Sequence, residues 1–487
     1  LLPATTWGEK MGTVTNSERR ISRVRPAVAA PGAARHDWSA VVDFAQRLEA
    51  LVPQRSPATL FPYALDNAAA GAEAIWNEHR ESTRGRDLDI TGLSWALLEA
   101  QGPQQWPLPE GAAVGKVRLY EDGIFPTPDG RARFDNVVYQ PVAEPREPRY
   151  PFSLTTGRLR DQWHGMSRTG TLGRLFGHVA EPSIQMHPQD MARRQLTDGD
   201  LVHVTSKRGS ILVPVQAGAE LALGQTFIAM HWGEECLSGV GAQGERLMGV
   251  NALTNSAFCP TSKQPELKHT AIKILKADMP WSLLGVAWLP EAEALAIREK
   301  LKGLMAQFPF ASVVPFGRER TGLLFRAASF DAVADEVIAQ IETLLGLGGV
   351  DVLRYADKKR GQRRAVKLER TADNAERVEL RGFVLAGDTS AEVWIKTLLQ
   401  DQLPAQAYGR LLLAPGSTAP VAVKTRGKQI CTCFNVTDET IRTTLADCRG
   451  FEDERLGQLQ TALKCGTNCG SCLPEVRKLV RASLPAA

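Results

Sequence analysis

Six of the eight cysteines in this chain of 487 residues lie between Cys431 and Cys472. Four of the six form two close pairs, Cys431-Thr432-Cys433 and Cys469-Gly470-Ser471-Cys472. Thiolates are ligands for zinc and for iron-sulfur clusters, and such crowding in one short segment indicates shared ligation rather than scattered packing. The spacing therefore predicts a metal centre.

The segment between the two pairs is expected to form two short helices that fold back on each other. Thr437 is expected to cap the first helix, which Gly450 ends. The second ends before Gly466, and Pro474 marks the start of a third. Apolar side chains at helical spacing define the buried faces: Ile441, Leu445 and Cys448 in the first helix, and Leu456, Leu459 and Leu463 in the second. The cysteine pairs then lie on loops at helix ends, where backbone N–H groups hydrogen-bond to cluster sulfur.

Three kinds of site use paired cysteines. Zinc ligands usually stand about two to four residues apart, whereas Cys431 and Cys433 have only Thr432 between them. Disulfide frameworks are typical of small secreted domains. These comparisons favour an iron-sulfur site.

The pattern Cys-x-Cys, a long gap and Cys-Gly-x-Cys resembles the bacterioferritin-associated ferredoxin domain, over about residues 428 to 482. This resemblance implies a 2Fe-2S cluster with four ligands: Cys431, Cys433, Cys469 and Cys472. Cys465 departs from the minimal pattern, because it adds a fifth thiol beside the site; it could be a spare ligand, but we favour a non-ligand. Cys448 is expected in the core, because it continues the face of Ile441 and Leu445.

Length and composition indicate a protein of several domains. The chain is 43% hydrophobic and 23% charged, as in ordinary soluble proteins, and its net charge of +4 is too small to indicate binding to nucleic acid. We find no apolar run long enough to span a membrane and no secretory leader, and the clustered thiols fit the cytoplasm. Because the chain begins at Leu1 rather than at Met, we expect it to be the C-terminal portion of a longer protein.

Helices are expected over residues 38–51 and 68–81 in the N-terminal part. The segment Asn16-Ser17-Glu18-Arg19-Arg20 has two interpretations. It could be a capped helix start. In its context it resembles the Glu-Arg-Arg segment of molybdopterin oxidoreductases of the dimethyl-sulfoxide-reductase family, which implies that residues 1–147 are the remainder of a catalytic domain.

From residue 148 the pattern changes to strands and tight turns. Alternating residues at 201–205 and 211–215, joined by a turn at 207–210, predict a hairpin in a barrel-like sheet. The polar segment 155–165 follows a strand at 152–154. Its glycines let backbone N–H groups approach an anion, Arg158 could pair with phosphate, and Asp161 could accept from a purine amino group.

Further motifs follow at 230–234, 250–254 and 259–268. In this order they resemble the molybdopterin-dinucleotide-binding domain of nitrate reductases, a barrel of the double-psi type, over residues 148–277. The resemblance implies that Trp232 lies near the substrate funnel as a catalytic residue. It implies ten cofactor-binding residues: Thr156, Gly157, Arg158, Asp161, Gln162, Trp163, His164, Gly165, Asn251 and Lys268. For any one of these residues taken alone, a surface or structural role is a simpler explanation than cofactor binding. This applies most to Lys268 and His231.

Residues 278–425 are predicted to form an α+β domain, with helices at 292–307 and 332–345 and strands at 311–316, 322–325 and 378–384. Five cations crowd one turn, and we interpret them as a solvated face rather than as a docking site for an acidic electron donor: Lys358, Lys359, Arg360, Arg363 and Arg364. Residues 426–487 are then the small helical 2Fe-2S domain.

The predicted fold class is therefore multidomain, α/β and α+β. Together the two resemblances imply a bacterial assimilatory nitrate reductase, which reduces nitrate to nitrite in the cytoplasm. They imply Mo-bis(molybdopterin guanine dinucleotide) and a 2Fe-2S cluster as cofactors, with a 4Fe-4S cluster in the part of the protein before Leu1. The expected partners are nitrate and an electron donor, either an NADH-dependent flavoprotein, a ferredoxin or a flavodoxin, with no nucleic acid and no membrane. Two alternatives stay open: a formate dehydrogenase-like enzyme and a non-catalytic electron-transfer module.

Overall fold

The computed structural model describes residues 2–52, 60–136, 138–240, 244–247, 249–266, 268–371, 377–414, 419 and 426–484. The chain divides into two compact units, Leu1–Tyr139 and Gln140–Ala487. The predicted boundary at residue 425, and Leu267 within the last dinucleotide-domain motif, lie outside the described residues.

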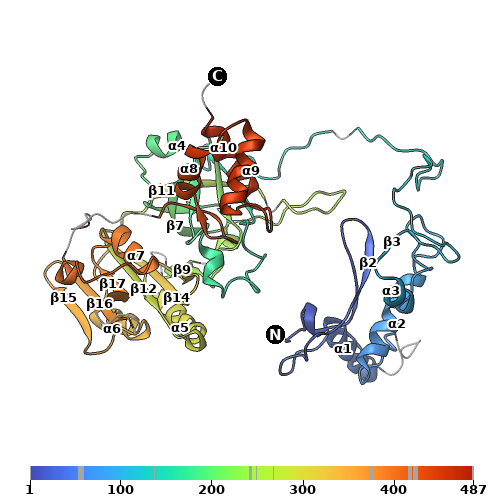
Figure 1. Cartoon of the computed structure of the whole chain (residues 1–487), viewed down its shortest axis with the longest axis horizontal. Helices are drawn as coiled ribbons and strands as arrows, with labels where there is room; N and C mark the ends of the chain where they lie inside the picture. Colours follow the sequence, from blue (N-terminus) through green and yellow to red (C-terminus); the bar gives the residue numbers. More distant parts are fainter. Residues whose placement is uncertain are drawn as a thin grey trace. The chain divides into compact units, whose positions relative to one another are not determined.

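The first unit combines a small antiparallel sheet with three helices (Figure 1). Its strands are β1 (Gly12–Thr15), β2 (Arg20–Val24) and β3 (Gln104–Gln105). Its helices are α1 (Asp37–Leu51), α2 (Ala68–Glu81) and α3 (Trp95–Gln101). The two predicted helices are confirmed. Helix α3 was not predicted, because its 7 residues are too few to show a helical period of apolar residues.

The segment from Asn16 to Arg20 is a turn, so its interpretation as a capped helix start is wrong. The Asn16 side-chain oxygen accepts from the backbone N–H groups of Glu18 and Arg20, each at 3.0 Å, and the turn joins β1 to β2. Arg19 adopts a left-handed φ of 61° and its guanidinium donates to Val117 O at 2.7 Å. Asparagine competes here for the backbone donors that a helix would need.

A closed six-stranded barrel begins the second unit, in the order β11-β4-β8-β5-β7-β6. Its strands are β4 (Phe152–Gly157), β5 (Ile184–Met186), β6 (Leu201–Thr205), β7 (Ser210–Ala217), β8 (Gln225–Ala229) and β11 (Thr270–Lys276). The predicted hairpin is β6–β7, in which Thr205 faces Ser210. The barrel and the rest of the architecture confirm the predicted fold class.

An eight-stranded sheet follows, in the order β10-β9-β13-β14-β12-β17-β16-β15. Its strands are β9 (Leu237–Val240), β10 (Arg246–Leu247), β12 (Trp281–Trp288), β13 (Phe310–Phe316), β14 (Gly322–Ser329), β15 (Val352–Asp357), β16 (Gln362–Arg370) and β17 (Val378–Ala386). Helices α5 (Glu291–Leu304) and α6 (Asp335–Leu344) cover one face. The other face packs against α7 (Glu392–Gln400) and the barrel. Alternate strand residues therefore serve two cores, with Leu283 in one and Leu284 in the other.

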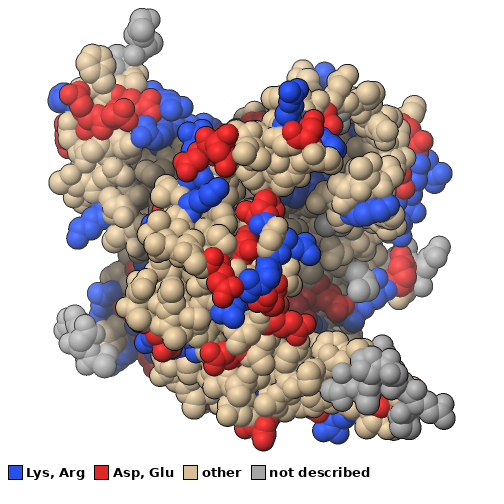
Figure 2. All heavy atoms as spheres, turned by 90° about the vertical axis from the view of Figure 1, so that its right-hand side faces the viewer, with Lys and Arg blue, Asp and Glu red and all other residues tan. Residues whose placement is uncertain are grey.

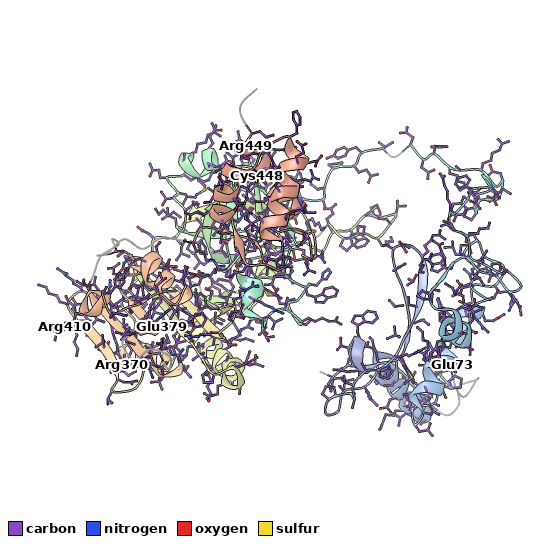
Figure 3. All side chains as sticks on the ribbon, in the orientation of Figure 1. Glu73, Arg370, Glu379, Arg410, Cys448 and Arg449 are labelled. Atoms are coloured by element: carbon purple, nitrogen blue, oxygen red, sulfur yellow. The ribbon has the colours of Figure 1, made fainter. Side chains whose placement is uncertain are left out.

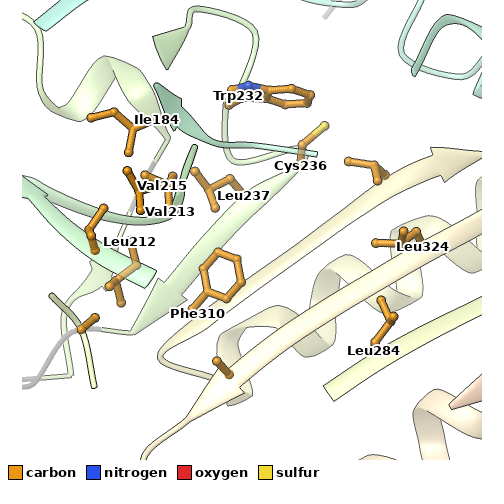
Figure 4. Close-up of a cluster of buried hydrophobic side chains, with 14 of the residues drawn as sticks. Ile184, Leu212, Val213, Val215, Trp232, Cys236, Leu237, Leu284, Phe310 and Leu324 are labelled. Carbon is orange, nitrogen blue, oxygen red and sulfur yellow. The ribbon is translucent and has the colours of Figure 1, made fainter. Parts of the chain in front are cut away.

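The barrel region and this sheet are joined. Strand β9 follows the barrel strand β8 in sequence but pairs with β13, where Leu237 faces Ser312. Figure 4 shows Leu237 beside Val213 and Val215 of the barrel and near Phe310 of β13. One hydrophobic core thus continues from the barrel to the sheet.

Three short helices close the described chain: α8 (Asp438–Asp447), α9 (Glu452–Leu463) and α10 (Leu473–Ala482). The predicted cap is confirmed, since Thr437 Oγ1 accepts from Thr440 N at 3.3 Å. Ile441, Leu445 and Cys448 lie in the small core as predicted, and Figure 3 labels Cys448 at the end of α8.

Charged side chains of both signs are interspersed on the face drawn in Figure 2. In the predicted cation turn, Lys358, Lys359 and Arg360 are exposed. Arg364 corrects the prediction of a solvated face, because its side chain is 1% exposed and donates to Ala414 O at 2.7 Å and to Asp388 at 3.1 Å. In the described part of the chain, no helix is both long enough and apolar enough to cross a bilayer.

The continuous core predicts the effect of truncating Phe310, which is 1% exposed between barrel and sheet. Phe310→Ala should lower the free energy of unfolding of the second unit by about 3–5 kcal/mol, because it leaves a cavity. The matched control is Phe330→Ala, since Phe330 is 54% exposed, and its effect should stay within about 0.5 kcal/mol. Denaturant titration of both variants checks this, and equal effects would contradict a shared core.

Candidate functional site

The four predicted ligand cysteines lie on two loops of the small helical region. Cys431 ends β18 (Gln429–Cys431), and Cys433 lies in the turn that leads to β19 (Val436–Thr437). Cys469 and Cys472 lie between α9 and α10, and Cys472 is the residue directly before α10. The left-handed conformations of Lys464, Gly466 and Gly470 reverse the chain so that this second loop faces the first.

Each loop contributes one cysteine to each of two contacts. The Sγ atoms of Cys433 and Cys469 are 3.4 Å apart. Cys431 and Cys472 form the second pair: after burial, the neighbouring Cys431 thiol is the next cause that raises the pKa of Cys472. Two thiolates on one tetrahedral metal with bonds of about 2.3 Å are separated by roughly 3.7 Å, close to the observed contact.

The donor set of the two loops consists of four cysteine thiols. In a 2Fe-2S cluster each iron takes only two protein ligands, so two cysteine pairs suffice. The donor set therefore fits the predicted cluster.

The site has a buried edge and an exposed edge. Cys431 and Cys472 are 2% and 3% exposed, whereas Cys469 is exposed. Burial raises the pKa of the Cys472 thiol to about 12, and hydrogen bonds from Ser471 lower the pKa of Cys469. A bound metal supplies the positive charge that keeps buried sulfur deprotonated.

The other two cysteines of this region lie in the core. Cys465 is fully buried and burial raises its pKa to about 11. Cys448 is also buried, and its thiol donates to Thr444 O at 3.4 Å. The prediction that Cys448 is a core residue is confirmed.

The predicted dinucleotide-binding residues gather at one end of the barrel. Strand β4 runs parallel to β8, with Gly157 beside Ala229, and antiparallel to β11, with Leu154 opposite Thr270. Thr156 and the segment up to Gly165 therefore leave the barrel where β8 ends and β11 begins. Lys268 lies just before β11, and is exposed.

Asn251 lies at the same end, because the backbone of its neighbour Val250 is bonded to the segment that follows β8. It lies in the short helix η3 (Val250–Ala252), whose first N–H donates to Trp232 O at 3.0 Å, shortly after β8. Asn251 is exposed.

His231 holds the loop that follows β4. From the sequence, a structural role was the simpler explanation for this residue, but its partners could not be predicted. Its Nε2 accepts from the Leu159 backbone N–H at 2.9 Å, and its Nδ1 lies 2.5 Å from His164 O. A carbonyl oxygen only accepts, so Nδ1 carries the proton and the ring is neutral. Burial is the largest cause that lowers the pKa of His231.

The loop residues differ in what their side chains do. Arg158, Trp163, His164 and Gly165 are exposed. Trp163 packs edge-on against His164, with ring centroids 5.3 Å apart. Gln162 instead points inward: it is 4% exposed and donates to Leu175 O at 3.2 Å.

The Asp161 carboxylate is hydrogen-bonded to two other side chains. Its carboxylate oxygens accept from Arg160 Nε at 3.2 Å and from Thr432 Oγ1 at 2.6 Å, and Thr432 stands between two of the ligand cysteines. Its predicted bond to a purine therefore stays a prediction. What the structure adds is a direct contact between this loop and the cysteine loop.

Trp232 is 1% exposed and packs against Phe176, with ring centroids 6.4 Å apart. Figure 4 shows it beside Cys236 at the edge of the hydrophobic core. In the described part of the chain its side chain is a packing element, and its predicted place near a substrate funnel stays a prediction.

Three parts of the chain match models of known protein families. Residues 152–271 match the Molydopterin dinucleotide binding domain, residues 1–47 match the Molybdopterin oxidoreductase family, and residues 429–482 match the BFD-like [2Fe-2S] binding domain. These matches confirm the predicted resemblances and the two cofactor classes, a molybdopterin dinucleotide and a 2Fe-2S cluster.

Several curated proteins are similar to the chain. A nitrate reductase of Klebsiella oxytoca is 32% identical over 488 residues, which cover 100% of this chain and 50% of that protein. A Synechocystis nitrate reductase is 37% identical over 278 residues, covering 56% and 36%. The F420-dependent formate dehydrogenase subunit alpha of Methanocaldococcus jannaschii is 33% identical over 274 residues, also covering 56% and 36%. The chain thus spans about half the length, or less, of these relatives.

The geometry of His231 predicts a pH dependence. Because its pKa is lowered in the folded state, its contribution to stability is complete above its ordinary pKa of about 6.5 and is lost as the pH falls through the folded value. His231→Gln has no titrating group there, so its free energy of unfolding should fall less steeply below about pH 6.5 than that of the unchanged chain. Urea titrations between pH 8 and 5 measure both curves. His203, whose pKa burial also lowers, is present in both proteins and cancels in the difference. If the free energies of unfolding of the two proteins changed in parallel with pH, a neutral His231 ring that bonds to the loop would be contradicted.

Proposed function

We propose that this chain, which resembles molybdopterin oxidoreductases, is part of a molybdenum-dependent enzyme that reduces nitrate to nitrite in nitrate assimilation. The observation that carries the proposal is the combination of a dinucleotide-binding barrel and a cysteine-pair site in one compact unit. A nitrate reductase similar along the whole chain supports the choice of substrate.

Electrons are proposed to enter through the cluster held by Cys431, Cys433, Cys469 and Cys472. The exposed Cys469 edge suits contact with a donor protein, for which an NADH-dependent flavoprotein, a ferredoxin or a flavodoxin is proposed. Each nitrate takes two electrons and two protons and yields nitrite and water, so a one-electron cluster delivers twice.

The barrel residues are proposed to bind the guanine dinucleotide of the molybdenum cofactor. The segment from Thr156 to Gly165 is proposed to cradle the dinucleotide. The exposed Arg158 and Lys268 side chains suit phosphate, and the exposed Asn251 suits polar groups of the pterin. When bound, the cofactor supplies the oxygen-atom transfer. His231 keeps the loop in shape, and Trp163 offers a ring for stacking.

The proposed division has four parts: residues 1–147 as the remainder of the catalytic domain, 148–277 as the dinucleotide domain, 278–425 as the α+β domain and 426–487 as the 2Fe-2S domain. The shared strand pairing of β9 and β13 supports treating the second and third parts as one rigid body. A cytoplasmic location is part of the proposal.

A formate dehydrogenase-like activity is the second candidate. It is favoured by the similarity to a formate dehydrogenase subunit over 56% of the chain. The C-terminal cysteine site favours nitrate reductase, since the resemblance to assimilatory nitrate reductases includes it. The third possibility is an electron-transfer module without catalysis of its own.

The cluster assignment predicts which cysteines matter. The chain purified without oxygen should contain two irons and no stoichiometric zinc, and should give a rhombic electron paramagnetic resonance signal on reduction. Cys469→Ser should lose this signal. The matched controls Cys448→Ser and Cys465→Ser replace buried cysteines and should keep it; loss of iron in Cys465→Ser alone would make Cys465 a ligand.

The product of the complete gene tests the substrate and the direction of electron flow. It should reduce nitrate and not oxidise formate, and Cys469→Ser should abolish reduction driven by the donor protein while small dyes still support it. Lys268→Ala should lower activity with every donor, since a charge-assisted phosphate contact is worth about 1.5–3 kcal/mol. Equal loss of dye-driven activity in both variants, with the fold intact, would show that the cluster is structural.

A further inference from the structure

The loop at residues 429–433, which we call the ligand loop, is held by side chains of the barrel. Arg160 Nη2 donates to Ile430 O at 2.8 Å. Thr432 Oγ1 donates to Asp161 Oδ2 at 2.6 Å. Both barrel residues belong to the segment that follows β4, so the ligand loop is tied to the proposed dinucleotide-binding loop.

A second cation reaches the ligand loop from the turn between β13 and β14. Arg318 Nη1 donates to Thr432 O at 2.6 Å, and its Nη2 donates to Cys433 O at 3.2 Å. The backbone around both ligand cysteines of this loop is therefore bonded to guanidinium groups from two other parts of the unit.

These guanidinium groups are themselves fixed. The side chain of Arg160 is 15% exposed, and it pairs with Asp161 and with Glu475 of α10. The side chain of Arg318 is 24% exposed, and its Nε pairs with the carboxylate of Glu319 at 3.1 Å. Glu475 also bonds to His178 and to Lys428, each at 3.1 Å, so α10 is tied to the barrel beside the ligand loop.

Charge at this position affects a redox centre. One-electron reduction of a cluster adds a negative charge, and net charge and hydrogen bonding near the cluster set its potential. Positive groups that are partly withdrawn from water stabilise the reduced state more than exposed ones do.

We propose that Arg160 and Arg318 are positioning residues of the cluster, which hold the ligand loop against the barrel and the sheet and raise the reduction potential. This inference rests on the proposed function, because it needs a 2Fe-2S cluster on the four cysteines. The step involved is the uptake of one electron by the cluster, from the proposed donor or from dithionite in the experiment, and no bond in the protein breaks.

Redox titration of the 487-residue chain with dithionite and mediators, followed by electron paramagnetic resonance, tests the proposal. In the double variant Arg160→Gln, Arg318→Gln, the ratio of reduced to oxidised cluster at a fixed potential should fall at least tenfold, which is a midpoint 59 mV lower for one electron. Arg318→Lys keeps the charge and should shift the midpoint less than Arg318→Gln. An unchanged midpoint in a double variant with two irons per chain would overturn the proposal.

Arg477→Gln is the matched control. It removes a guanidinium from the same small region, but Arg477 pairs with Glu452 and Asp453 at 3.3 Å and 2.9 Å rather than with the ligand loop. Its midpoint potential should equal that of the unchanged chain. A shift as large as that of the double variant would mean that the potential depends on the net charge of the region and not on the contacts of Arg160 and Arg318, which would contradict the proposal.

Hydrogen exchange in the iron-free chain tests the holding role independently of the cluster. Amides of residues 429–433 should exchange at least tenfold faster in the double variant than in Arg477→Gln, and equal rates would refute the role. Absence of a rhombic signal in the unchanged chain would instead refute the proposed cluster. The exchange rates of the iron-free chain would still test whether Arg160 and Arg318 hold the ligand loop.

Discussion

Hydrogen bonds from Arg160 and Arg318 to the ligand loop join three parts of the second unit at one point. The loop needs them because strands β18 and β19 are only 3 and 2 residues long and give it few ladder bonds of its own. Carbonyl groups that a short hairpin leaves unpaired must find donors elsewhere when they are partly buried. Charged donors from neighbouring parts satisfy them and orient the loop.

A close approach of backbone accompanies this junction. A side chain at Gly173 would meet the carbonyl oxygens of Phe316 and Gly317 at 2.6 Å, so this segment lies directly on the end of β13 and glycine is required there. Gly177 lies against the amide end of the Gln429 side chain of the ligand loop.

The arrangement relates the two proposed centres through one loop. The segment after β4 presents Arg158, Trp163 and His164 to solvent, while its Arg160 and Asp161 contact the cysteine loop. The neutral ring of His231 bonds to both ends of this segment. The same short segment therefore contributes contacts to the cysteine loop and exposed side chains to the proposed dinucleotide site.

The sequence by itself determined the local features: the helices α1, α2, α8 and α9, the hairpin β6–β7, the Thr437 cap and the pairing of cysteines into a candidate cluster site. Each depends on residues close in sequence, through periodicity, capping or ligand spacing. Only the tertiary structure decided that Trp232 and Arg364 are buried, that β9 crosses to the eight-stranded sheet, and that Arg160, Asp161 and Arg318 hold the ligand loop. Their partners lie tens to hundreds of residues away, and no local pattern records which distant carbonyl a guanidinium will meet once the cores have packed.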